Sequence, residues 1–148
     1  MNLTPAQQQL AHLSLQSVMG ASGKEPEFPE RVTDLASEIW SEFIDEEITD
    51  LLSEKQLVRL GELLEDEDVT EEEFSNFLNE SVPGFDEMYQ EKVLDNKAVV
   101  VEGRVKQLRI LTQGETDLQL SLDTCEDLIE KGEWLKVQDI LATEFAEY

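Results

Sequence analysis

The chain has 148 residues, of which 35 are acidic and 11 basic, for a formal net charge of −24. A chain of this length fits one domain, and its 40% hydrophobic content excludes wholesale disorder. The charge repels nucleic acid and anionic membrane surfaces and attracts basic ones, so we expect the partner to be another protein rather than nucleic acid or a membrane.

Cysteine content and hydropathy indicate the compartment. Cys125 is the only cysteine, which excludes an internal disulfide and suits the reducing cytoplasm. No apolar run approaches the roughly 20 residues that span a bilayer. The N-terminus lacks the basic stretch of a secretory signal. We therefore expect a cytoplasmic protein.

The first 24 residues differ in charge from the segment after them. Residues 1–24 contain no acid, whereas residues 25–84 contain 20 acids and three bases. Thr4, placed before a proline, is a helix-start signal. Its helix would carry one apolar stripe, formed by Leu3, Leu10, Leu13 and Val18. We expect residues 1–29 to form a loosely attached arm and linker, and residues 30–148 to form a single helical domain.

Apolar residues from Val32 to Leu52 recur at spacings of three and four, which predicts an amphipathic helix with Trp40 in the core. Ser53 and Thr70 are each followed three residues later by Gln or Glu, the pattern of a capping box, so a new helix is predicted after each. A proline-glycine corner at Pro83 then breaks the chain.

Residues 86–113 predict one long helix that ends at Gly114. Its apolar residues follow a heptad-like seam, formed by Leu94, Ala98, Val101, Val105, Leu108 and Thr112. A β-hairpin across Gly114 is the alternative, since three consecutive valines and the alternating leucines after residue 117 suit strands. The seam would pack either within the chain or against a second copy in a homo-oligomer.

The end of the chain predicts a helical hairpin. Thr116 with Gln119 offers a further capping box, Gly132 ends that helix, and an apolar pattern from Trp134 builds the last one. Together the elements predict a compact all-α bundle of about five to seven helices.

Candidate chemical groups do not form a recognisable catalytic or cofactor site. The acids of EDEDVTEEE, residues 65–73, fail the calcium-loop test, because Glu71 stands where the turn needs glycine and Phe77 where a bidentate Glu is needed. His12 and Cys125 lie on different predicted elements, and Cys125 is expected to be a small core residue. We expect no enzyme activity, no cofactor and no metal.

One basic patch stands out against the acidic background. Between Lys97 and Thr112 the bases Lys97, Arg104, Lys106 and Arg109 are accompanied only by Glu102. We interpret this patch as pairing with the acidic helices of residues 30–80 within the same fold.

The run LSEKQLVRLGELLEDEDVTEEEFSNFLNESVPGFDEMYQEKV, preceded by RVTDLASEIWSEFIDEEITDLL, resembles a small acidic helical domain family of unknown function from candidate-phyla bacteria. The resemblance covers about residues 30–95. It implies a helical fold and a cytosolic bacterial setting, and it transfers no activity and no site. The ending DLIEKGEWLKVQDILATEF also looks like the glycine-tryptophan hairpins of helical secretion and assembly chaperones.

These observations favour a non-enzymatic protein-protein interaction module, an adaptor or an assembly chaperone. The alternative is an acidic inhibitor that mimics nucleic acid and blocks a basic DNA- or RNA-binding protein. The residues expected to bind the partner are the apolar ones around the proline corner, namely Leu57, Leu60, Leu64, Phe74, Phe77 and Phe85.

Overall fold

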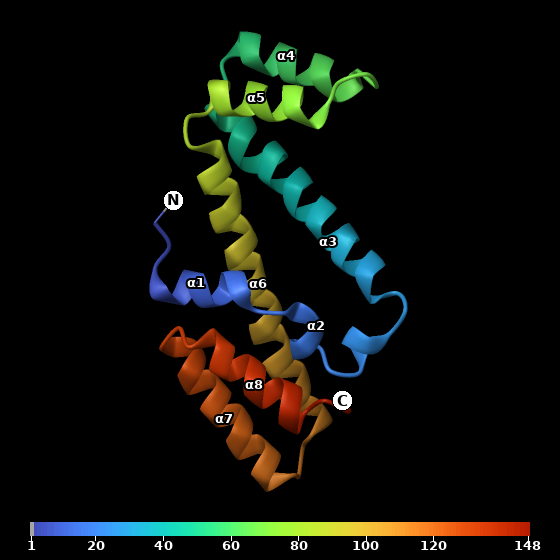
Figure 1. Cartoon of the computed structure of the whole chain (residues 1–148), viewed down its shortest axis with the longest axis vertical. Coiled ribbons are helices and arrows are strands. Elements are labelled where there is room, and N and C mark those ends of the chain that lie inside the picture. Colours follow the sequence, from blue (N-terminus) through green and yellow to red (C-terminus); the bar gives the residue numbers. More distant parts are fainter. Residues whose placement is uncertain (1) are drawn as a thin grey trace. The chain divides into compact units, whose positions relative to one another are not determined.

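A computed structural model describes residues 2–148 and holds, within them, eight α-helices and no strand (Figure 1). The all-α prediction is confirmed. The chain divides into unit 1, comprising Met1–Thr33 and Leu94–Tyr148, and unit 2, comprising Asp34–Val93. The division falls inside two helices, α3 (Phe28–Glu42) and α6 (Phe85–Leu111). No helix of the described chain has the length and apolar character to cross a membrane.

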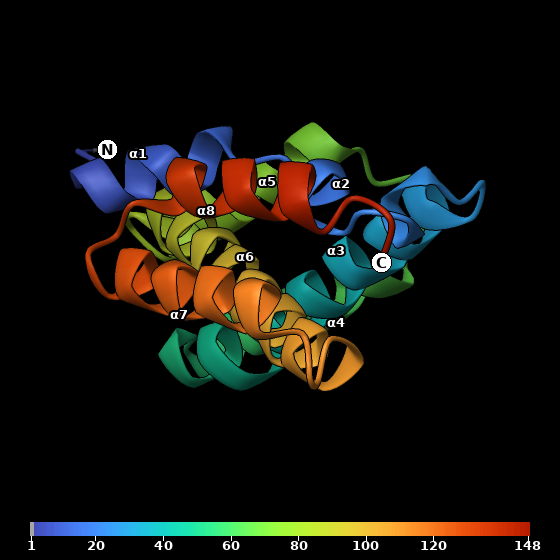
Figure 2. The same ribbon diagram turned by 90° about the horizontal axis from the view of Figure 1, so that it is seen from below.

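Unit 1 is formed by the two ends of the chain together with the later part of α6. Figure 2 shows α7 and α8 side by side as the C-terminal hairpin that the sequence predicts, and α1 and α2 both contact α8. Besides α6 its elements are α1 (Pro5–His12), α2 (Leu15–Val18), the 3₁₀ turn η1 (Ser22–Lys24), α7 (Thr116–Glu130) and α8 (Trp134–Glu144).

The expected arm is part of the core of unit 1. Thr4 caps α1 in a complete capping box with Gln7, as the sequence predicts, and the apolar stripe beyond it is buried, from Leu10 to Val18. The amide of Ser14 also donates to Gln138 at 2.7 Å. The expected boundary between a loose arm and the helical domain at residue 29 is therefore not observed. The apolar stripe of the arm is covered by α6 and by the hairpin of α7 and α8 rather than by solvent.

The heptad-like seam of α6 lies in the same core. Leu94, Val101, Val105, Leu108 and Thr112 are buried, and Ala98 packs beside them. The chain itself covers these residues, so the seam packs within unit 1, the first of the two expected alternatives.

Two predictions near the end of α6 are wrong. Residues on both sides of Gly114 are helical, so the alternative hairpin does not form. Thr116 and Gln119 form no capping box, since α7 has no side-chain cap. Instead the Gln119 amide donates to the backbone carbonyls of Arg109 and Thr112, at 3.2 and 2.9 Å. These carbonyls lie at the end of α6, where intrahelical donors are missing. The Gln119 Oε1 atom, which a capping box would use as acceptor, accepts from the Arg109 guanidinium at 3.2 Å instead.

Unit 2 is built from short helices around an aromatic core. After α3 the chain continues through a π-helix, η2 (Phe43–Ile48), and a 3₁₀ turn, η3 (Thr49–Leu51). Next come α4 (Glu54–Glu65), α5 (Glu71–Ser81) and the first turns of α6. The buried core residues are Phe43, Ile44, Ile48, Leu52, Leu60, Leu78, Val82 and Phe85.

The helix starts of unit 2 follow the sequence closely. Ser53 and Gln56 form the complete capping box of α4. At α5 the Thr70 hydroxyl accepts from the amide of Glu73 at 3.1 Å, which is the side-chain half of the expected box. Gly84 adopts a φ of 81° directly before α6, a conformation that glycine takes without steric cost.

Candidate protein-binding pocket

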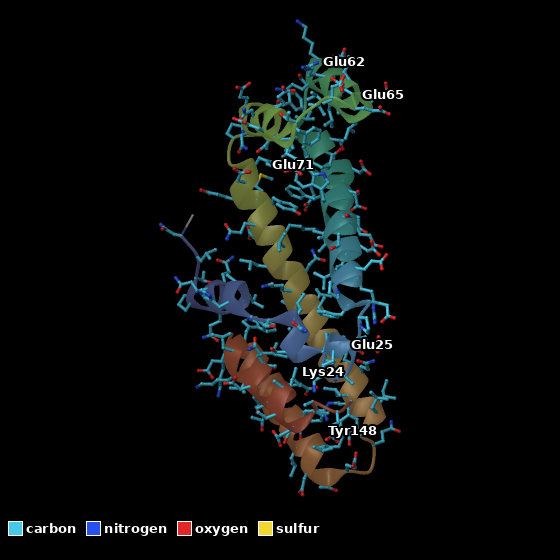
Figure 3. All side chains as sticks on the ribbon, turned by 45° about the vertical axis from the view of Figure 1, so that its right-hand side comes forward. Lys24, Glu25, Glu62, Glu65, Glu71 and Tyr148 are labelled. Atoms are coloured by element: carbon cyan, nitrogen blue, oxygen red, sulfur yellow. The ribbon has the colours of Figure 1, made fainter. Side chains whose placement is uncertain are left out.

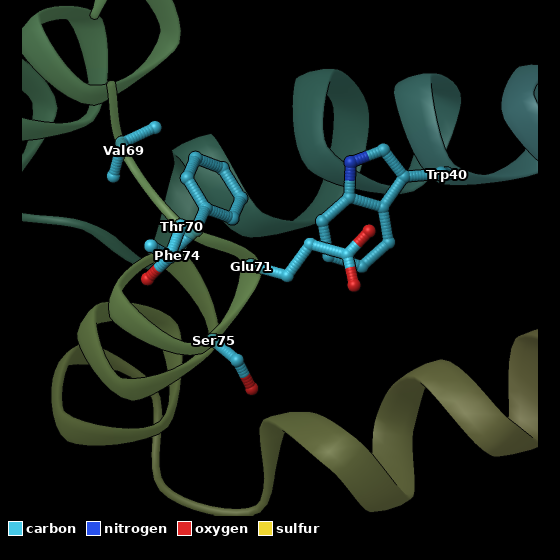
Figure 4. A pocket seen from close by; sticks show the side chains of 6 residues that line it. All are labelled: Trp40, Val69, Thr70, Glu71, Phe74 and Ser75. Carbon is cyan, nitrogen blue, oxygen red and sulfur yellow. The ribbon is translucent and has the colours of Figure 1, made fainter. Parts of the chain in front are cut away.

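A pocket opens in unit 2 where α3 meets the start of α5. It has a volume of about 480 Å³ (Figure 4). Its lining residues come from α3, from the loop before α5 and from the first turns of α5, and they are Trp40, Val69, Thr70, Glu71, Phe74 and Ser75. Two aromatic rings and a valine make the lining mainly apolar, while two hydroxyls and one carboxylate supply polar groups, the composition typical of a ligand pocket.

The indole of Trp40 is held by the aromatic core of unit 2. It meets the ring of Tyr89 edge-on at a centroid distance of 5.0 Å and that of Phe85 edge-on at 5.7 Å. On the pocket side it contacts Phe74 at 6.0 Å, with the rings tilted by 52°. Edge-on pairs at these distances are favourable, so the indole is fixed in place before any ligand arrives.

Thr70 and Glu71 place polar groups at the pocket because α5 begins there. Thr70 is the N-cap residue, and Glu71 occupies the first helical position, where the helix dipole favours a carboxylate. Seven of the nine residues from Glu65 to Glu73 are acids, and all seven are exposed. Figure 3 shows Glu62, Glu65 and Glu71 on the same two-helix part of unit 2, α4 and α5.

The six residues expected to bind a partner fall into three environments. Leu60 and Phe85 are buried in the core. Leu57 and Leu64 are exposed on α4, by 39% and 61%. Phe74 lines the pocket, and Phe77 lines a second pocket of about 340 Å³ between α4 and α5, together with Arg59, Leu63, Glu73, Asn76 and Glu80. The expected residues therefore do not form one continuous site.

Five of the six lining residues were not expected to bind a partner, namely Trp40, Val69, Thr70, Glu71 and Ser75. Trp40 was expected in the core, and it does pack there in part, but it is only half-buried. The available signal was a large aromatic residue within an apolar stripe. That pattern does not reveal which side of the ring neighbouring elements leave uncovered.

Three of the four bases in the patch of α6 pair within unit 1, so for these three the prediction of pairing with residues 30–80 is wrong. Lys97 donates to the backbone carbonyls of Leu10 and Leu13, both at 3.0 Å. Arg104, only 2% exposed, donates to the carbonyls of Val18 and Tyr148, at 3.2 and 3.0 Å. Carbonyls at the end of a helix lack intrahelical donors, and these cations supply donors to them.

Arg109, the third member of that patch, pairs with acids of α7. Its guanidinium donates to Glu126 at 3.0 Å and to Asp123. These hydrogen bonds, with that to Glu126 the stronger, raise the pKa of Arg109 further above its usual range. Its acidic partners thus lie within unit 1.

Cys125 is a core residue, as the sequence predicts. It is fully buried in unit 1, and burial, followed by the charges of Glu144 and Glu126, raises the pKa of its thiol to about 11. A thiol that stays protonated at neutral pH is a poor nucleophile. Within the described residues no group of three or more His, Cys, Asp or Glu side chains is arranged to hold a metal ion.

Comparison with known proteins gives no relative: neither a family model, nor a curated protein, nor a solved structure matches this chain. The resemblance to the candidate-phyla family stays a prediction.

Proposed function

We propose that this chain is a non-enzymatic protein-interaction module, acting as an adaptor or assembly chaperone, which docks a segment of a partner protein in the pocket beside Trp40 and Phe74. The observation that carries the proposal is the pocket itself, with aromatic walls on a fixed scaffold. Anchoring of a partner side chain in an aromatic pocket is the usual way in which a small interface obtains its affinity.

The lining supports binding rather than catalysis. Of the six lining residues Glu71 alone is ionisable, whereas general acid-base or nucleophilic chemistry needs two or more cooperating groups in reach of one substrate atom. Hydroxyls of Thr70 and Ser75 suit hydrogen bonds to a partner backbone. We expect no reaction to be catalysed.

Selection from a displayed library of random dodecapeptides tests the proposal. The full chain should enrich peptides, and filling the pocket with Ser75→Phe should weaken their binding by about tenfold or more, since it occupies the anchor site. Ser41→Phe, the same change at an exposed α3 position outside the lining, is the matched control and should leave binding unchanged. Peptides that bind wild type and Ser75→Phe equally would rule out the pocket as the docking site.

The charge of unit 2 favours a second candidate, an inhibitor that mimics nucleic acid. Residues 34–93 contain 20 acids and three bases, and every one of these acids is exposed. Such a protein would displace labelled duplex DNA from a basic helix-turn-helix protein, and the displacement would weaken steeply as salt rises. Displacement that does not change with salt would eliminate this candidate.

A further inference from the structure

The pocket of unit 2 combines two groups that together recognise a cation. Trp40 offers an indole face, the aromatic surface that attracts cations most strongly. Glu71 lines the same pocket, and Figure 4 shows its side chain extending from the start of α5 toward the indole. An aromatic face and a carboxylate on one cavity are complementary to a positively charged, partly apolar side chain.

The Glu71 carboxylate is available for such a contact. Among the described residues it makes no hydrogen bond and no ion pair, and the two nearest bases along the chain are Lys55 and Arg59. Arg59 is already paired with Glu62 at 3.1 Å. A carboxylate that lines a pocket without a cation of its own favours a ligand that brings one.

The charge around the pocket also favours a cationic ligand. The seven acids between Glu65 and Glu73 are accompanied by no base within that stretch. Their summed field raises the local concentration of cations and disfavours an anionic or strongly acidic segment. Apolar side chains gain nothing from this field, so it discriminates between a basic anchor and a purely apolar one.

Arginine suits these groups better than lysine. Its planar guanidinium stacks on an aromatic face and donates in a fork that matches a carboxylate, whereas the lysine ammonium is a strongly hydrated point charge. A volume of about 480 Å³ accommodates a whole arginine side chain.

We propose that the pocket takes an arginine side chain of the partner segment, stacked on Trp40 and paired with Glu71. This inference rests on the proposed function, in which the same pocket docks a partner, and it adds the chemistry of the anchor. The partner is therefore a protein that presents an arginine in an accessible, locally basic segment.

Four capped pentapeptides, Gly-Ser-X-Ser-Gly with X as arginine, lysine, citrulline or leucine, are the probes. Binding to the full chain is followed by the indole NMR signal of Trp40, which a Trp134→Phe sample distinguishes from that of Trp134. The arginine peptide should bind about fivefold or more tightly than the citrulline and leucine peptides, with lysine between them. Citrulline keeps the planar shape of arginine and removes its charge, so equal binding of these two peptides would overturn the inference.

Two variants locate the charge that is recognised. Glu71→Gln should weaken binding of the arginine peptide about fivefold or more and leave binding of the leucine peptide unchanged. Glu72→Gln removes the same charge from the next position of α5, which is also exposed but lies outside the lining, and should have little effect. Equal losses in both variants would mean that only the general acidity of unit 2 is sensed, and would overturn the inference.

The outcomes separate this inference from the function on which it rests. If the leucine peptide binds as tightly as the arginine peptide, the inference fails while docking in the pocket stands. If no pentapeptide shifts the Trp40 signal, the inference also fails, and the library selection with Ser75→Phe then decides the proposed function alone.

Discussion

The two units use the same material, short amphipathic helices, to opposite effect. Unit 1 pairs three of its cations within itself. Lys97 and Arg104 donate to backbone carbonyls, and Arg109 pairs with exposed acids of α7. Unit 2 has 20 acids and three bases, compared with 15 and eight in the rest of the chain. In unit 1, cations therefore bind groups of the unit itself, whereas in unit 2 the acids face solvent.

The hydrophobic cores of the two units also differ, in size and in the kind of side chain that they contain. Unit 1 buries thirteen apolar side chains, most of them aliphatic. Unit 2 buries ten, eight of them in one core cluster, and it relies on contacts among aromatic rings, with Trp40 and Phe74 only half-buried at the edge. We expect these partly uncovered rings to make unit 2 more able to accept a ligand side chain.

Removing a core ring from unit 2 should give the largest effect. Phe43 is 2% exposed and contacts the rings of Phe85 and Tyr89, both at 5.6 Å. Phe43→Ala should destabilise unit 2 by about 3–5 kcal/mol, the usual cost of such a cavity. Each unit has one tryptophan, so urea unfolding is followed by Trp40 in a Trp134→Phe background and by Trp134 in a Trp40→Phe background.

The free energy of unfolding should fall by a large amount in the transition followed by Trp40 and by a small amount in the transition followed by Trp134. Leu64→Ala, at a 61% exposed position, is the control and should move neither. Equal shifts at both tryptophans would show that the units unfold as one, and the comparison would then describe composition but not stability.

The internal use of cations in unit 1 is tested by Arg104→Met. The change leaves the buried carbonyl of Val18 and the partly buried one of Tyr148 without their donor, which should cost about 3 kcal/mol. The loss of stability should appear in the urea unfolding transition that is followed by Trp134. Lys106→Met, at an exposed position of the same helix, should have little effect. An Arg104→Met protein as stable as wild type would mean that desolvation of the guanidinium cancels its hydrogen bonds.

The smallest effect concerns alkaline pH. Burial raises the pKa of the Cys125 thiol from 9.0 to about 11. Between these values the unfolded chain loses the proton and the folded chain keeps it, so unit 1 should lose stability as pH rises, by roughly 2 kcal/mol near pH 11. Burial lowers the pKa of Lys97, which opposes this trend.

Comparison of wild type with Cys125→Ala isolates the thiol from Lys97 and from other alkaline titrations. Urea unfolding at several pH values, followed by Trp134, should show a stability difference that narrows from pH 9 upward and is constant below it. A difference that is constant throughout would contradict a buried, protonated thiol.

Much of the fold could be predicted from the sequence. Thr4, Ser53 and Thr70 cap helices where expected, and the long helix, expected over 86–113, spans Phe85–Leu111. Each of these features depends on groups a few residues apart, because a cap satisfies amides of its own first turn and a seam repeats along its own helix. Thr116 with Gln119 shows the limit, since the Gln119 side chain bonds to Arg109 and Thr112 at the end of the preceding helix instead of to the start of its own.

The candidate site was predictable only in part. Phe74 was identified because it lies on an apolar helix face, while Trp40 and Glu71 become neighbours only once α3 and α5 pack. Leu60 and Phe85 looked equivalent to Phe74 in sequence and are instead core residues. Periodicity identifies which side chains are apolar and share a face, and it does not identify which of them other elements cover.

The all-α class, most helix boundaries and the acidic character of the chain can be read from the amino-acid sequence, because they follow from local hydrogen bonding and composition. Three features could be found only in the folded chain: the N-terminal helices belong to the core of unit 1, Lys97 and Arg104 donate to backbone carbonyls, and Trp40 borders a pocket. The physical reason is that burial and pairing of this kind depend on which distant segments meet, and that is settled by the packing of the whole chain.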